Sequence, residues 1–165
     1  MGNLEDGVYM LTSLAALLDR LADRLARRRQ AGEPTRSARM KLLLYAMIGG
    51  ALGSGARHLV NVGFGRWLGM GFPWWTFFVN VFGCFLMGVV IESLALKFQG
   101  SADLRTFLAT GILGGFTTFS AFSLDFAFLM QRHEQMQAAL YLCGSVALSI
   151  LAFYAGMSLT RWLLT

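Results

Sequence analysis

The sequence predicts an all-α membrane protein with four transmembrane helices, the third of them broken. Hydrophobic residues make up 56% of the 165 residues and charged residues only 14%, whereas about a quarter of a soluble domain is charged. Four stretches carry no charge, at 42–56, 67–91, 107–124 and 138–160, and a membrane-crossing helix needs roughly 20 mostly apolar residues. None shows the polar outer face of a helix on a soluble core. We therefore expect four crossings within residues 40–165.

Residues 1–39 form an extension that differs in character from the membrane domain. Their leucines recur at alternating steps of three and four with charges between them, which predicts one amphipathic helix. These leucines are Leu11, Leu14, Leu18, Leu21 and Leu25. The apolar face suits a membrane surface, with the arginines at 27–29 among anionic head groups. The alternatives are a loosely ordered extension or a chain that starts at Met40, and a signal peptide is not expected because charges interrupt the leucines.

The first predicted span covers about residues 42–62. Gly49 and Gly53 form a G-x-x-x-G pair, which permits close approach of a neighbouring helix. Arg57 lies near the far end, where its long side chain either snorkels to the interface or holds a carboxylate or an entering anion. The glycine-rich residues 63–73 then predict a turn.

The second predicted span covers Trp74–Leu96 and begins with an interfacial tryptophan pair. Asn80 is the only strongly polar side chain in its first half, and an amide at that depth needs partners. Asn80 therefore either faces a polar path or makes an interhelical hydrogen bond. Glu92 lies nearer the far interface.

The third span contains the break. Gly114 and Gly115, followed by Thr117 and Thr118, weaken a helix where an unbroken one would be most stable. Non-helical backbone at membrane depth is tolerated where it is buried in protein or lines a cavity, and its freed carbonyls can hold a cation. Beyond the break, Phe119 and Phe122 are three residues apart, which places both on one helical face.

The fourth predicted span covers Ala138–Thr160. Ser145 and Ser149 are four residues apart, which places two hydroxyls on one face, as a polar track requires. The alternative is that each serine donates to a carbonyl of its own helix.

No catalytic constellation is visible in the sequence, and we do not expect an enzyme. His58 and His133 lie at span ends, and Cys84 and Cys143 lie in separate apolar runs without metal-ligand spacing, which favours packing roles. The net charge is +5, but seven of the fourteen Lys and Arg residues precede Met40. This distribution does not predict a nucleic-acid-binding face.

The polar groups of the predicted spans favour a pathway for a small anion. They are neutral donors without a ring of carboxylates, accompanied by phenyl edges that carry the positive part of the ring quadrupole. The donors are Asn80, Ser120, Ser145 and Ser149, and the rings are those of Phe119 and Phe122. A narrow bore would have to exclude larger halides, because these groups cannot distinguish anions by charge.

From residue 40 to about residue 164, the sequence resembles the Fluc (CrcB) family of fluoride channels. The matching segments are Gly49–Arg57, Val79–Gly83 and Gly114–Phe122, in this order on successive spans. The resemblance implies a dual-topology, antiparallel homodimer with two fluoride pores. It further implies a passive, highly selective channel that exports cytoplasmic fluoride and lowers its toxicity, as a multi-pass protein among the lipids of a bacterial inner membrane.

The resemblance also implies residue roles. Backbone carbonyls of Gly114 and Thr117 from both chains would hold a structural sodium ion at the dimer centre. The pore residues would be Asn80, Phe119, Ser120, Phe122, Ser145 and Ser149, and Arg57 would match an arginine at the end of the first span. One departure is Ala121, where the family usually has Thr or Ser.

The other departure is the extension, whose seven arginines favour one orientation by the positive-inside rule. Without it, the Lys and Arg residues on the two sides of the membrane are nearly balanced.

Two alternatives belong to other classes. A small proton-coupled four-helix exporter would need a titratable carboxylate, for which Glu92 and Asp125 are the candidates. A scaffold protein would carry no ion flux.

Overall fold

The computed structural model describes residues 15–23, 35–67, 71–98 and 100–165. The chain divides into two units, Met1–Met40 and Lys41–Thr165, and each is described by itself. In the first unit, residues 15–23 are helical and exposed, including Leu18 and Leu21 of the predicted apolar face. The other leucines of that face and the arginines at 27–29 lie outside the described residues.

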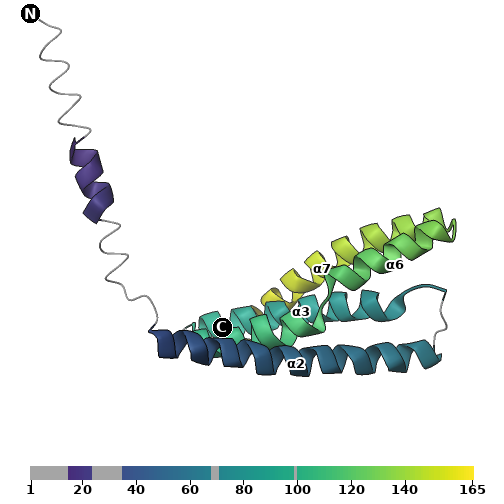
Figure 1. Cartoon of the computed structure of the whole chain (residues 1–165), viewed down its shortest axis with the longest axis horizontal. Coiled ribbons are helices and arrows are strands. Elements are labelled where there is room, and N and C mark those ends of the chain that lie inside the picture. The colour runs from purple at the N-terminus through teal and green to yellow at the C-terminus, as the bar shows by residue number, and fades with distance from the viewer. Residues whose placement is uncertain (1–14, 24–34, 68–70, 99) are drawn as a thin grey trace, which may run out of the picture. The chain divides into compact units, whose positions relative to one another are not determined.

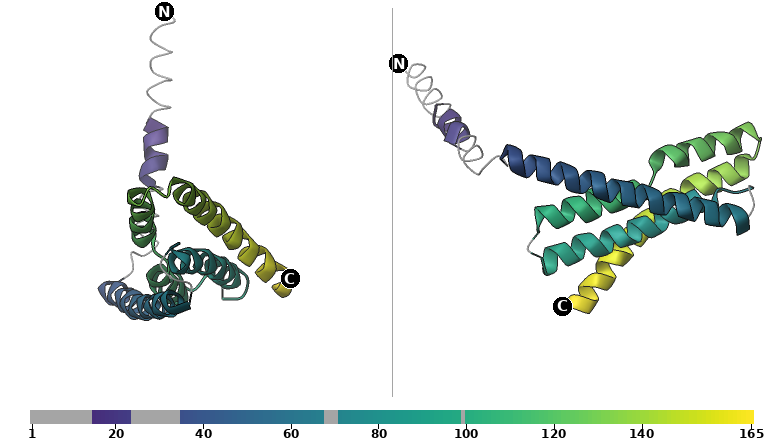
Figure 2. Two further views of the ribbon diagram at one scale, coloured as in Figure 1. Left: turned by 90° about the vertical axis from the view of Figure 1, so that its right-hand side faces the viewer. Right: turned by 60° about the horizontal axis from the view of Figure 1, so that its bottom comes forward.

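Every regular element in the described part of the chain is helical (Figure 1). In chain order the elements are α2 (Arg36–Trp67), α3 (Trp74–Leu96), α4 (Ala102–Arg105), the π-helix η1 (Thr106–Leu113), α5 (Gly114–Phe116), α6 (Phe119–Gln131) and α7 (Gln135–Leu164). The last two form a hairpin, and α7 then runs back across α3 (Figures 1 and 2).

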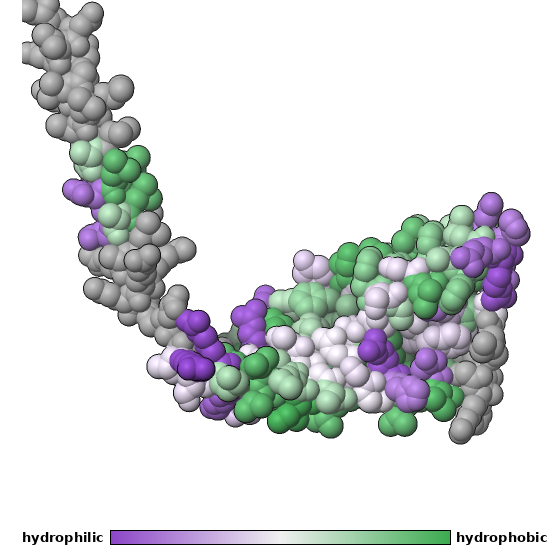
Figure 3. All heavy atoms as spheres, in the orientation of Figure 1, coloured by the Kyte–Doolittle hydropathy of each residue, from purple (hydrophilic) through white to green (hydrophobic). Residues whose placement is uncertain are grey.

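Among the described residues, three helical segments are long and apolar enough to cross a membrane: Trp74–Leu96, Ala102–Gln131 and Gln135–Leu164. Figure 3 shows hydrophobic patches on the unit Lys41–Thr165, with hydrophilic residues at both ends and a further hydrophilic group between them. The chain is therefore compatible with an all-α membrane protein that crosses the bilayer several times. The predicted first span is helical within α2 but is not among the three segments, because glycines, Arg57 and His58 lower its hydropathy. A fourth crossing stays a prediction.

Two helix boundaries differ from the sequence prediction. The predicted turn at 63–73 begins too early, because α2 continues to Trp67. A glycine inside a helix costs only about 1 kcal/mol, so the glycines of this stretch do not by themselves end α2. Pro73 is the N-cap residue of α3. The charged residues within 97–105 predict a loop over that whole range, but α4 already begins at Ala102. Gly100, with φ of +69°, makes the turn before it.

In the unit Lys41–Thr165, neighbouring helices approach each other backbone to backbone at glycines. A Cβ atom on Gly88 of α3 would overlap the Phe153 carbonyl, and one on Gly156 of α7 would overlap the Phe85 carbonyl. The close approach predicted for Gly49 and Gly53 is confirmed. A Cβ on Gly49 would lie 2.6 Å from the Phe107 carbonyl oxygen of η1, and one on Gly53 would also overlap η1. These contacts fix α3 against α7, and α2 against the broken span, without intervening side chains.

Candidate functional site

The site is organised around a break between α5 and α6. Helix α5 ends at Phe116, and Thr117 (φ −77°, ψ 157°) and Thr118 (φ −155°, ψ 119°) are extended. The glycines at 114 and 115 are still helical, so the non-helical backbone falls on the two threonines. The preceding segment η1 has the wider turns of a π-helix, a conformation that is frequent at functional sites.

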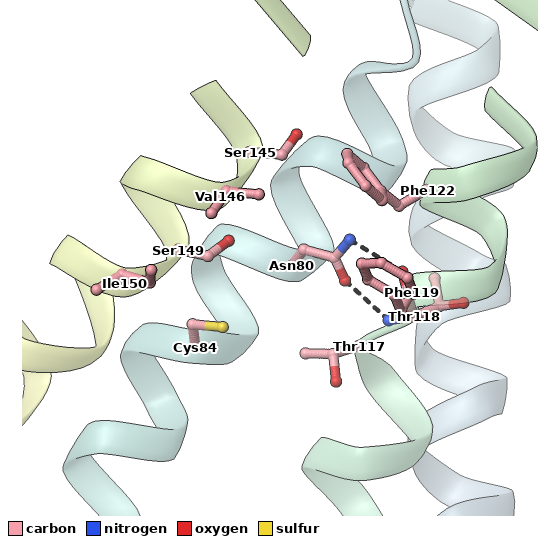
Figure 4. A pocket seen from close by; sticks show the side chains of 10 residues that line it. All are labelled: Asn80, Cys84, Thr117, Thr118, Phe119, Phe122, Ser145, Val146, Ser149 and Ile150. Atoms are coloured by element: carbon pink, nitrogen blue, oxygen red, sulfur yellow. Dashed lines mark hydrogen bonds between the residues drawn. The ribbon is translucent and has the colours of Figure 1, made fainter. Parts of the chain in front are cut away.

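Asn80 of α3 holds the break in place. Its Nδ2 donates to the Thr118 carbonyl at 3.0 Å, and its Oδ1 accepts from the Thr118 N–H at 2.8 Å (Figure 4). Thr118 is only 8% exposed, and each buried backbone group left without a partner would cost about 1–3 kcal/mol. The partners that Asn80 was expected to need are thus the two main-chain groups that the break releases.

The same hydrogen bonds deprive two carbonyls of their helical donors. In a continuous helix the Thr118 N–H would donate to the Gly114 carbonyl, but here it donates to Asn80. The Ala121 N–H would donate to the Thr117 carbonyl, but it donates to Thr118 Oγ1 at 3.2 Å. The two carbonyls predicted to hold a cation, those of Gly114 and Thr117, have therefore both lost that donor, which fits oxygen ligands for a hard cation.

A first cavity of about 290 Å³ lies between α3, the break, α6 and α7 (Figure 4). Its wall combines a few polar groups with apolar side chains. The lining residues are Asn80, Cys84, Thr117, Thr118, Phe119, Phe122, Ser145, Val146, Ser149 and Ile150. Five of the six predicted pore residues are therefore together in one wall.

Ser145 contributes a buried hydroxyl without a partner. The residue is 4% exposed, and its Oγ makes no hydrogen bond within the described structure. The alternative of donation to its own helix is not adopted here, although Thr160 on the same helix does donate to the Gly156 carbonyl at 2.9 Å. A buried hydroxyl without a partner is destabilising unless something else satisfies it. Ser145 therefore marks this wall as a place for a hydrogen-bond acceptor.

The two phenylalanines of the site differ in burial. Their ring centroids are 5.4 Å apart, and the Phe122 ring also lies 5.1 Å from that of Tyr141. Phe122 is 6% exposed and belongs to the core between α6 and α7, whereas Phe119 is 75% exposed. Ser120 does not line the first cavity; its hydroxyl lies 3.2 Å from Thr118 Oγ1.

A second cavity, of about 440 Å³, is more polar than the first. Thr118 of the break lines both cavities. Arg57 lines the second cavity and has no hydrogen-bond or ion-pair partner among the described residues, as an entering anion would require. Ala121 lines this cavity too. The full lining is Ser54, Arg57, His58, Asn61, Trp75, Thr76, Val79, Thr118, Ala121, Leu124 and Asp125.

Both carboxylates considered for proton coupling have partners. Glu92 is 4% exposed, and its Oε1 accepts from Nε of Arg161 at 2.7 Å. Asp125 Oδ2 accepts from the Tyr141 hydroxyl at 3.3 Å. Neither carboxylate lines the first cavity.

Sequence reasoning missed Cys84 as a residue of the site. It was expected to be a packing residue, but it lies in the wall of the first cavity. Its position four residues after Asn80 places both on one face of α3, and this spacing is the signal that would have found it.

Comparison with known proteins gives consistent matches to one family. Residues 44–157 match the family model described as CrcB-like protein, Camphor Resistance (CrcB). A protein of Chelativorans sp. (strain BNC1) is 52% identical over 122 residues, which are 74% of this chain and 98% of the relative. One of Nitrobacter winogradskyi is 49% identical over 119 residues, 72% of this chain and 94% of the relative. One of Rhodopseudomonas palustris (strain BisB5) is 51% identical over 118 residues, which are 72% of this chain and 95% of the relative. Each of these relatives is named fluoride-specific ion channel FluC.

Proposed function

The chain belongs to the CrcB family, and from that premise we propose that it is a passive, highly selective fluoride channel. Its relatives are named as fluoride-specific channels. The observation that carries the proposal is the buried, unpartnered hydroxyl of Ser145 in a cavity whose described lining has no carboxylate. Fluoride is a small anion and a strong hydrogen-bond acceptor, which is the ligand that this wall lacks.

The residues of the first cavity would replace the water around the anion. The Ser145 and Ser149 hydroxyls can donate to it, and Asn80 has a second amide proton, because an amide nitrogen carries two and the Thr118 carbonyl takes one. The Phe119 and Phe122 rings would present their positive edges. Larger halides would be excluded by the width of the path, not by charge.

Fluoride would reach this cavity through the second one. The guanidinium of Arg57, which has no partner among the described residues, would attract the anion toward the break. Ala121 in the same wall offers no hydroxyl, so we propose that conduction here is slower than in a relative with Thr or Ser at this position. Comparing the fluoride flux of Ala121→Thr with that of the unaltered protein tests this, and an unchanged flux would contradict it.

We further propose an antiparallel homodimer with a structural sodium ion at its centre. Phe119 is 75% exposed in the protomer although it belongs to the proposed pore, and a second copy would cover it. The carbonyls of Gly114 and Thr117, which have lost their helical donors, would hold the ion. When bound, sodium would supply a fixed positive charge that ties the two breaks together. Crosslinking in membranes tests the dimer, and a loss of thermal stability on replacing sodium with N-methylglucamine tests the ion.

We propose that the channel lies in a bacterial inner membrane and lets cytoplasmic fluoride leave down its gradient. The arginines of the extension favour one orientation by the positive-inside rule, so we propose that the two orientations, both of which an antiparallel dimer needs, are present in unequal numbers. Labelling of an amino-terminal tag from each side of the membrane measures this bias. An even distribution with the extension present would refute it.

The proton-coupled exporter remains the second candidate, on one observation. Asp125 lines the second cavity, through which fluoride would pass. If the protein were such a carrier, Asp125→Asn would abolish transport and a pH gradient would drive it. For a passive channel we expect fluoride flux to persist in Asp125→Asn.

A flux assay tests the proposed function directly. Purified protein is reconstituted into liposomes loaded with potassium fluoride, valinomycin is added, and external fluoride is recorded with an electrode beside a chloride control. We expect rapid fluoride efflux without chloride efflux, lost in Phe119→Ile. Phe128→Ile, on the same helix but outside the first cavity, is the matched control and should conduct. No efflux from folded, reconstituted protein would refute the channel.

A further inference from the structure

We propose that Cys84 places a thiol inside the ion path, so that a small electrophile or a soft cation that binds its sulfur blocks conduction. This inference rests on the proposed channel function. It concerns a ligand class, thiophilic reagents and metal cations such as Ag⁺, that the fluoride site itself does not require.

The position of Cys84 in the first cavity is the first observation. The residue lies one helical turn from Asn80 on α3 and lines the same wall. It is partly buried. Figure 4 shows the sulfur directed toward the side of the cavity where Thr117 lies. A group attached to this sulfur would therefore extend into the cavity and not into the contact between α3 and α7.

The second observation shows independently that this cavity is built for a ligand. Ser145 lies across it on α7, is 4% exposed and has a hydroxyl without a partner in the described structure. Ser149, one turn further along α7, lines the same wall. A cavity that leaves such a hydroxyl unsatisfied is not a packing defect between apolar helices, because those interiors are filled by side chains. The thiol of Cys84 therefore faces a space that an ion uses.

The reaction with a methanethiosulfonate reagent illustrates the chemistry. The Cys84 thiol loses its proton to water, and the thiolate sulfur attacks the sulfenyl sulfur of the reagent. A new S–S bond forms as the S–S bond of the thiosulfonate breaks, and methanesulfinate leaves with the electron pair. The cysteine is oxidised to a mixed disulfide, and the reagent supplies the oxidising equivalent. A dithiol reductant reverses the step by thiol–disulfide exchange.

Two adducts separate the causes of a block. Methyl methanethiosulfonate adds a neutral methylthio group, which acts only by occupying part of the cavity of about 290 Å³. The 2-sulfonatoethyl reagent adds a larger group with a fixed negative charge, which also repels an anion from the path. We expect both adducts to slow fluoride efflux and the charged adduct to slow it more.

The chain offers its own control, because its only other cysteine is Cys143. Cys143 is exposed on α7 and lines neither cavity. The test uses Cys143→Ala protein in liposomes, with fluoride efflux recorded before and after each reagent. The 2-sulfonatoethyl adduct should reduce efflux by about ten-fold or more, since it both occupies and charges a narrow path. Dithiothreitol should restore it. For the double variant Cys84→Ala/Cys143→Ala, fluoride efflux is compared only before and after reagent in the same protein. We expect the reagent to leave this efflux unchanged.

Two results would overturn the proposal. One is a protein mass that shows one adduct on Cys84 while efflux is unchanged, which places the sulfur outside the path. The other is no adduct on the folded protein when the same protein reacts after unfolding. If the untreated protein conducts no fluoride, the proposed function fails separately. In that case, modification of Cys84 in the folded protein by the water-soluble charged reagent still supports a water-filled path at this residue. If the folded protein is not modified, the proposed path at Cys84 is overturned.

Discussion

Two regions of the molecule differ in how they treat the helix backbone. The contact between α3 and α7 packs two backbones directly together, whereas the break before α6 frees backbone groups next to a cavity. At the contact, Gly88 and Gly156 let two backbones touch, and there is no room for a Cβ atom. At the break, glycines stay helical while Thr117 and Thr118 leave the helix, and a side chain from another helix satisfies the freed backbone. The first region excludes everything but backbone, whereas the second keeps a cavity and a hydroxyl without a partner.

The two regions are linked through α3. Asn80 and Gly88 are on the same helix, so the glycine contact with α7 fixes the amide that holds the break. The serines that face Asn80 across the first cavity are on α7. A rigid helix pair therefore sets the width of the cavity, and the polar groups in it do not need to contribute to packing.

The largest effect is expected from filling the glycine contact. Gly156→Ala places a methyl group against the Phe85 carbonyl and within 3.1 Å of the Val89 nitrogen, so α3 and α7 must separate. We expect a loss of unfolding free energy of about 3 kcal/mol, at the upper end for overpacking because backbone atoms cannot rotate away. Unfolding in mixed micelles of sodium dodecyl sulfate, followed by circular dichroism, measures it.

Gly144→Ala is the matched control on the same helix. A methyl group there would lie 3.6 Å from Phe77 Cε2, an ordinary contact. Removing a helical glycine should then raise stability by up to about 1 kcal/mol. Equal effects of the two substitutions would contradict the assignment of the tight contact to Gly156.

A smaller effect on stability but a full effect on function is expected at the break. Asn80→Ala leaves the N–H and carbonyl of Thr118 without their partners, and Thr118 is 8% exposed. We expect a loss of about 2–3 kcal/mol, from two partly rehydrated groups, and no measurable fluoride efflux. Asn61→Ala, an exposed asparagine on α2, is the control and should keep its stability. If Asn80→Ala conducted normally, the break would not need this side chain.

The sequence allowed the regular parts of this fold to be predicted, but only part of the site. The apolar runs predicted α3 and α7, and the spacing of Gly49 and Gly53 predicted a close approach, because these patterns are local. The partner of Asn80 could not be predicted, since it lies 38 residues away. The Gly114 carbonyl loses its helical donor through that long-range contact, because the Thr118 N–H donates to Asn80 instead. The spacing of Cys84 from Asn80 places both on one face of α3, but which helix forms the opposite wall of the cavity depends on the path of α7.

The smallest change in stability is expected at Ser145, where the effect on stability and the effect on fluoride efflux should have opposite signs. Its hydroxyl is buried without a partner, so Ser145→Ala removes a group that is destabilising in the free protein. We expect the unfolding free energy to rise by about 1 kcal/mol or to stay level, while fluoride efflux falls because the anion loses a donor. Thr160→Val is the contrast, because Thr160 donates to the Gly156 carbonyl and lines neither cavity. It should lower stability slightly and leave the rate of efflux unchanged. A Ser145→Ala protein that loses stability as Thr160→Val does would mean that the hydroxyl serves packing and not the ion.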